Sequence, residues 1–146
     1  MAETTYWPGL LPGKIFNKEV NLTADSMMIM LCTSTYVFNQ DTHAYKSSVT
    51  NEVASGGGYT TGGQALTSVT FTYNTATNTW SFGAANVTWA SSTITARTAV
   101  IYDNTPATDA TRPIIAVVDF QVDKTSTGGP FTITWASGVI NTIVVS

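Results

Sequence analysis

The sequence predicts an all-β fold, an antiparallel β-sandwich or jelly-roll-like barrel with an extended N-terminal arm. Short apolar runs, rich in threonine, valine and isoleucine, recur between turn residues at roughly the 8–12-residue spacing of such folds. No segment carries the apolar periodicity of a helix of about ten residues or more. We therefore predict an N-terminal arm over residues 1–22 and a single β-sandwich domain over residues 23–146.

The predicted arm combines apolar anchors with tight turns. Two Pro-Gly pairs within residues 8–13 disfavour a regular helix there, and residues 14–21 are expected to add one weak helical turn. The anchors are Tyr6, Trp7, Leu10 and Leu11. A terminal segment this apolar is expected to dock, either back onto its own domain or onto a neighbouring subunit. These four residues are candidates for a partner interface.

The strands follow from runs of β-branched and aromatic residues. Residues 27–33, MMIMLCT, do not alternate, which indicates a strand buried on both faces. Residues 56–63, GGGYTTGG, form a loop that leads into a strand at 65–73 and not into a helix, which disfavours phosphate binding. Further strands are predicted at residues 79–82, 87–89, 93–102, 113–121, 131–135 and 139–145, with a short helix at 44–49 and a tight turn at 123–130.

One strand pairing is predicted in register. If Tyr102 lies opposite Ile114 in an antiparallel hairpin, Arg97 falls opposite Asp119. Opposite charges directly across two strands stabilise a sheet by roughly 0.2–1 kcal/mol. The same alternation places Ile94 and Tyr102 on one face of their strand.

The composition excludes several classes of partner. Only 10% of the residues are charged, the net charge is −3, and the six basic residues are scattered, so we expect no nucleic-acid partner. No apolar run approaches the ~18 residues that would cross a membrane, so no membrane association is expected. The chain lacks a secretory signal pattern, and its one cysteine, Cys32, is expected to be a buried apolar residue in a protein made in a reducing cytoplasm.

No constellation of residues predicts catalysis. The single histidine, His43, lies two residues after Asp41, but no serine sits in a glycine-flanked elbow, and one histidine with one cysteine does not make a structural zinc site without carboxylates. We therefore predict no catalytic residue, no cofactor, no metal and no enzymatic activity. Among the tryptophans, Trp80 and Trp135 are in phase with apolar neighbours and are expected in the core. Trp89, which precedes a serine pair, is expected to be exposed and joins the candidate interface.

Several motifs from residue 51 to the end resemble small structural proteins of tailed bacteriophages that are encoded among the head genes. The motifs are NEV at 51–53, GYTTGG at 58–63, VTW at 87–89, TARTAVIY at 95–102, VDF at 118–120 and FTITW at 131–135. The resemblance implies a virion protein, in particular a capsid cement or decoration protein on the capsid exterior. It implies the major capsid protein as partner, and no catalytic residue.

Three alternatives remain open from the sequence: an enzyme, which would require His43 beside an acidic residue in a cleft, and two non-catalytic classes. One is a phage tail or fibre component. The other is a carbohydrate-binding module, whose mark would be a flat exposed platform formed by Trp89 with Trp7 or Tyr59. For the cement protein, a homo-oligomer bridging capsid subunits is expected, because interfaces are enriched in aromatic residues and depleted of charge and weak contacts on a repeating lattice add up.

Overall fold

The computed structural model describes residues 3–145, and these form eight strands, one α-helix and two short 3-10 helices. The strands are β1 (Thr4–Tyr6), β2 (Met27–Cys32), β3 (Gln64–Ala65), β4 (Thr70–Asn74), β5 (Thr79–Gly83), β6 (Val87–Asp103), β7 (Ile114–Ile133) and β8 (Val139–Val144). The helices are α1 (Leu11–Phe16), η1 (Lys46–Ser48) and η2 (Ala136–Gly138). All strand pairs within the described residues are antiparallel, so the all-β prediction is confirmed.

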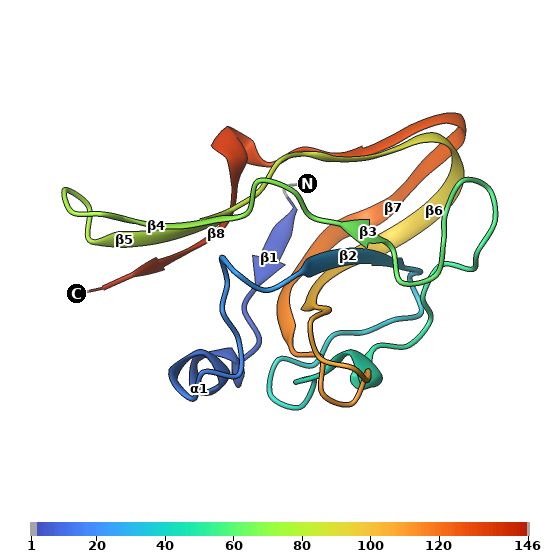
Figure 1. Cartoon of the computed structure of the whole chain (residues 1–146). Coiled ribbons are helices and arrows are strands. Elements are labelled where there is room, and N and C mark those ends of the chain that lie inside the picture. Colours follow the sequence, from blue (N-terminus) through green and yellow to red (C-terminus); the bar gives the residue numbers. More distant parts are fainter. Residues whose placement is uncertain (1–2, 146) are drawn as a thin grey trace.

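The strands form two sheets. The larger has the order β1-β7-β6-β2-β3, and the smaller has the order β4-β5-β8. Figure 1 shows the long β6–β7 hairpin curving over one side of the molecule, while the smaller sheet extends away from it on the other side. The larger sheet remains open, with β1 and β3 as its edges. The fold is therefore sandwich-like and not a closed barrel.

The β6–β7 hairpin is longer than the sequence predicts. β6 runs unbroken through residues 87–103, where two strands were expected, and β7 continues through 123–130, where a tight turn was expected. The two strands pair with each other from Val87–Ile133 to Tyr102–Ile114, so each satisfies the other's backbone. Turn-forming residues such as Gly128 lie in bulges of this ladder and do not end the strand.

The bulges overturn the predicted Arg97–Asp119 pair. Tyr102 does lie opposite Ile114, but the register shifts next to that pair, and Asp119 faces Thr98. Arg97 falls in a second irregularity, and its Nε donates a hydrogen bond to Asp123 at 2.9 Å. Each extra residue in one strand moves every later pair by one position.

The irregularity at Arg97 reverses which residues of β6 face each core, since Ile94 and Ala96 lie in the main core before it and Ala99 and Ile101 after it. Ile94 lies in the main core, whereas Tyr102 lies in a second cluster on the opposite face of the larger sheet. The expectation that both share one face is therefore wrong. Residues of β2 serve both cores: Ile29 belongs to the main core and Met30 to the second. Burial of this strand on both faces is confirmed.

The glycine-dense loop lies against the β-strands. Gly63 has a φ of +76°, and a Cβ there would collide with the carbonyl oxygen of Ile29. Gly58 has a φ of +82°, and a Cβ there would lie 2.5 Å from the carbonyl oxygen of Ser91. Glycine is required at these two positions because both the backbone angle and the close approach exclude a side chain.

The described part of the predicted arm packs against the sandwich. β1 pairs with β7, with Tyr6 opposite Val117, and Leu11 is buried in the main core. Of the two docking modes left open by the sequence, the chain adopts the one on its own domain. The prediction that residues 8–13 avoid regular helix is wrong, because Pro12 lies in the first turn of α1, where a proline needs no backbone donor.

Candidate functional site

The five residues predicted as a partner interface do not share one surface. Leu10 is half-exposed, whereas Leu11 and Trp89 are only 2% and 6% exposed. Tyr6 and Trp7 are partly buried. Leu10 is therefore the member of this set that is most available to a partner.

Trp89 is a core residue. Its neighbours Thr88 and Ala90 are exposed, so the pleat of β6 turns Trp89 inward. Its ring packs edge-on against Phe131 at 6.0 Å and lies 5.9 Å from Tyr59, which is also buried. The expectation of an exposed Trp89 is wrong, and so is the platform of Trp89 with Tyr59 or Trp7 that a carbohydrate-binding module would need.

Tyr6 and Trp7 hold the N-terminal segment on the body. The Tyr6 ring lies 6.2 Å from Phe38, and the Trp7 ring lies 5.8 Å from Phe82. Trp7 Nε1 also donates a hydrogen bond to the carbonyl oxygen of Thr142 in β8. Both aromatic residues thus stabilise the chain's own fold.

α1 presents a large apolar side chain to solvent. Phe16 is 85% exposed, and Leu10 lies just before the same helix. Lys14 anchors the other side of α1: its Nζ lies 3.6 Å from the centre of the Tyr45 ring and 3.2 Å from Glu19 Oε1. Because the Lys14 contacts hold α1 in place on one side, the exposed Phe16 side chain has a fixed position on the surface.

A groove of about 360 Å³ opens between this segment and the smaller sheet. Its apolar lining comes from Ile15, Val20, Leu22 and Phe71, and we call these four residues the apolar groove; Lys18, Asn21 and Thr23 add polar groups to the same lining. Ile15 lines the groove and the next residue of α1 is the exposed Phe16, so the groove lies beside the helix that carries this side chain.

The smaller sheet continues the apolar surface beyond Phe71. Trp80 stacks on Phe71 at 4.7 Å, and the Tyr73 ring lies 5.2 Å from Trp80. Tyr73, Trp80 and Ile143 lie opposite one another across the three strands. Tyr73 and Ile143 are exposed and Trp80 is half-buried, so the expectation of Trp80 in the core holds only in part. Trp135, in contrast, is buried as predicted.

Sequence reasoning missed Phe16 and Tyr73. The alternation of Phe71 with Tyr73, and of Trp80 with Phe82, indicated a core-facing side of a hairpin. That side is covered only near Phe82, because the sheet extends past the body (Figure 1). One signal in the sequence was available: no charged residue occurs between Glu52 and Arg97 or after Lys124. The smaller sheet is therefore free of charge.

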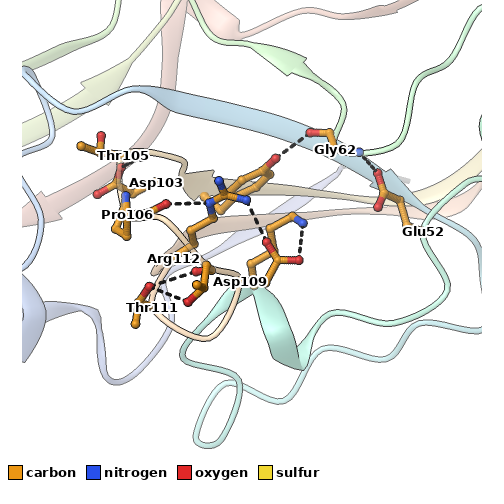
Figure 2. A network of polar contacts seen from close by, with 11 residues as sticks. Glu52, Gly62, Asp103, Thr105, Pro106, Asp109, Thr111 and Arg112 are labelled. Carbon is orange, nitrogen blue, oxygen red and sulfur yellow. Dashed lines mark hydrogen bonds and ion pairs between the residues drawn. The ribbon is translucent and has the colours of Figure 1, made fainter.

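A polar network holds the loops where β6 ends and β7 begins, far along the hairpin from the smaller sheet (Figure 2). Asp109 accepts hydrogen bonds from Lys46 at 2.8 Å and Arg112 at 2.9 Å, and these two cations lower the pKa of its carboxyl group. Tyr102 donates to the carbonyl oxygen of Gly62, and burial raises its pKa to about 12. The contacts tie the 104–113 loop and the glycine-dense loop to the sheet.

Asp103 is the one charged group of this region that is almost fully buried, at 1% exposure. Its Oδ1 accepts a hydrogen bond from the Thr105 N–H, whereas Oδ2 has no hydrogen-bond partner within residues 3–145. Burial raises the pKa of Asp103, and the nearby Asp25 raises it further.

Comparisons with known proteins identify no relative: no protein-family model, curated protein or solved structure matches the chain. Across residues 3–145, no three His, Cys, Asp or Glu side chains gather in a way that could hold a metal ion. Over the same residues, no helix is long and apolar enough to cross a membrane.

Proposed function

We propose that this protein is a structural protein of a bacteriophage virion, namely a capsid cement or decoration protein. It binds on the capsid exterior across subunits of the major capsid protein, as a homo-oligomer, after synthesis in the host cytoplasm. It acts by binding and uses no catalytic residue and no cofactor. The motifs between residues 51 and 135 that resemble phage head proteins support this assignment.

The observation that carries the proposal is the exposed apolar projection beside the apolar groove. Phe16 leaves 85% of its surface in solvent although α1 is held in place by Lys14 and the buried Leu11. Contiguous exposed apolar area is typical of interaction surfaces, and one buried aromatic anchor often contributes a large share of the binding energy of an interface. A capsid subunit that covers Phe16 would remove this apolar area from water.

The experiment measures binding of the purified protein to shells assembled from the major capsid protein encoded in the same genome. Phe16→Asp should weaken binding at least about tenfold, because a buried carboxylate replaces an aromatic anchor. Val37→Asp is the matched control, because Val37 is 77% exposed but lies on the loop over the second core. It should bind as tightly as the wild-type protein.

Point variants are the right tool because the N-terminal segment belongs to the fold. Removing residues 1–13 would delete β1 and the buried Leu11, and would unsettle the main core. Wild-type protein that fails to bind the shells, or that binds purified tails instead, would contradict the proposal. Equal binding of Phe16→Asp and the wild-type protein would show that another surface is used.

A further inference from the structure

We propose that β4 pairs with β4 of a second copy of this chain, so that the two smaller sheets join into one six-stranded sheet. The pairing is antiparallel and centred on Thr72. The inference deepens the homo-oligomer of the proposed function and rests on that part of it, but the pairing does not require a capsid. The argument starts from the backbone of β4.

The outer edge of β4 has free hydrogen-bonding groups. Val145 N–H donates to the Asn78 carbonyl oxygen at 2.8 Å, so Asn78 directs its backbone groups toward β8. The backbone N–H and C=O groups of successive residues point to alternate sides of an antiparallel strand. The backbone groups of Trp80, two residues after Asn78, therefore also point toward β8. Tyr73 pairs with Trp80, so its backbone N–H and C=O groups point away from β5, and those of Phe71 do the same. No hydrogen bond within residues 3–145 engages these outward groups of Phe71 and Tyr73.

The other edges are short, capped or bulged. β1 has three residues and β3 has two. On β8, the Thr142 carbonyl accepts from Trp7 Nε1, and the Thr142 N–H donates to the Asn141 side chain. The free stretches of β6 and β7 carry the register shifts between Trp89 and Thr98. Such devices protect edges against pairing, and β4, five residues long, has no charge, proline or bulge.

The sequence of β4 is complementary to itself. Thr70–Asn74 reads TFTYN, which alternates polar and aromatic residues about Thr72. With Thr72 opposite Thr72 of the second copy, Phe71 of each copy lies opposite Tyr73 of the other. Phe71 and Tyr73 are the residues whose backbone groups point outward, so these opposed pairs can form two hydrogen bonds each. Aromatic and threonine pairs across strands are favourable.

The distribution of charge and of apolar surface favours a second copy of the chain as the partner of the β4 edge. Each chain carries a net charge of −3, but the charged residues lie outside the 53–96 and 125–146 stretches that contain the whole smaller sheet. The paired strands themselves therefore bring no like charges together, and the charged residue that lies beside Phe71 is Lys18 at the groove. Tyr73 of the second copy would also cover Phe71 at the rim of the apolar groove.

The contact is small, so the expected dimer is weak. A pair of five-residue strands buries less than the roughly 1,200 Å² of a stable interface, and we expect a Kd on the order of 10–100 µM. On a capsid lattice, the high local concentration of bound copies would favour the same pairing.

Analytical ultracentrifugation of the purified protein over this concentration range tests the proposal. The wild-type protein should shift from its 15.5 kDa monomer to twice that mass. Thr72→Lys should raise the dimer Kd about fivefold or more, because it places two like charges directly opposite each other. Thr72→Glu should do the same, and an equimolar mixture of the two variants should dimerise again. Thr72 is exposed, so neither variant disturbs the core.

Thr142→Lys is the matched control. Thr142 lies in the same cross-strand row as Thr72, through Ser81, but two strands away from the proposed contact. It should leave the dimer Kd unchanged. Amide hydrogen exchange gives a second readout, since the Phe71 and Tyr73 amides should become protected as the protein concentration rises.

A wild-type protein that stays monomeric throughout, or a dimer that Thr72→Lys does not weaken, overturns the pairing. Either result leaves the capsid proposal intact if Phe16→Asp still reduces binding to shells. Conversely, a dimer sensitive to Thr72→Lys that binds no shell would overturn the capsid proposal and retain the β4 pairing.

Discussion

Trp7 and Thr142 lie 135 positions apart in the chain, and Trp7 Nε1 donates a hydrogen bond to the Thr142 carbonyl oxygen at 3.2 Å. The contact joins the N-terminal segment to β8, next to the packing of Trp7 on Phe82. It occupies a carbonyl on the outer edge of β8. One side chain therefore both fastens the first residues of the chain and closes a sheet edge.

The first prediction separates these two roles of Trp7. Trp7→Phe keeps an aromatic ring against Phe82 but removes the donor, and should lower the free energy of unfolding by about 1 kcal/mol. Trp7→Ala should lower it by about 2–3 kcal/mol, because the half-buried ring is lost as well. Urea unfolding followed by circular dichroism measures both values. Equal losses would mean that ring packing against Phe82 contributes nothing.

A second prediction concerns the buried hydroxyl group of Tyr59. It accepts a hydrogen bond from the Leu31 N–H at 3.0 Å and donates one to Glu52 Oε1 at 2.7 Å. Tyr59→Phe should lower the free energy of unfolding by about 1–3 kcal/mol, because a buried N–H loses its partner.

Tyr73→Phe serves as the comparison in the same urea experiment. The Tyr73 hydroxyl donates to Asn78 at an exposed site, where water replaces the lost contact. Its removal should change stability by less than about 0.5 kcal/mol. A loss as large as that of Tyr59→Phe would contradict the special role of the buried hydroxyl.

A third prediction follows from the raised pKa of Asp103. A carboxyl group with a raised pKa binds more protons in the folded than in the unfolded state. Its contribution to stability is therefore fully present below the ordinary value of 3.8 and is lost as the pH rises from there through the raised pKa. Asp103→Asn has no carboxyl group to ionise, so it should not lose stability as the pH rises. At pH 7 its free energy of unfolding should exceed that of the wild-type protein by about 1 kcal/mol.

Unfolding free energies between pH 3 and pH 8 test the Asp103 prediction. The difference between Asp103→Asn and the wild-type protein should grow with pH across the lower part of this range. Asp41→Asn, at an exposed loop position, should follow the wild-type curve. A destabilised Asp103→Asn at pH 7 would show that the ionised carboxylate is needed there.

A fourth prediction concerns thiol reactivity. Cys32 is fully buried, and burial raises the pKa of its thiol to about 12, with a further contribution from Glu52. Because the thiolate is the reactive form, the folded protein should not react with Ellman's reagent at pH 8 and should release one equivalent after unfolding in urea. Val145→Cys adds an exposed thiol at the end of the smaller sheet and should react at once.

The sequence predicted strand positions well where residue type alone determines them. The non-alternating MMIMLC run became β2, buried on both faces, and the runs at 79–82 and 139–145 became β5 and β8. The single strand predicted at 65–73 is instead divided into β3 and β4. The register predicted for the β6–β7 hairpin was wrong, because a bulge depends on how two distant strands fit together. The one-residue shift beside Tyr102 therefore displaced Arg97 from Asp119 without any local signal.

The interface residues show a related limit. Trp89 and Tyr73 both lie in strands of alternating residues, yet the first is buried and the second exposed. Alternation indicates which side chains share a face, but not whether another layer covers that face. Only the path of the smaller sheet beyond the body decides that Tyr73 meets solvent and Trp89 does not.

The uneven placement of charge has a consequence for how the contact between two copies responds to salt. Dissolved ions weaken contacts between charged groups and act little on neutral ones. Contacts made through the smaller sheet should therefore keep their strength from dilute buffer to seawater salinity. A dimer joined through β4 would tolerate changes of salt that loosen assemblies held by ion pairs.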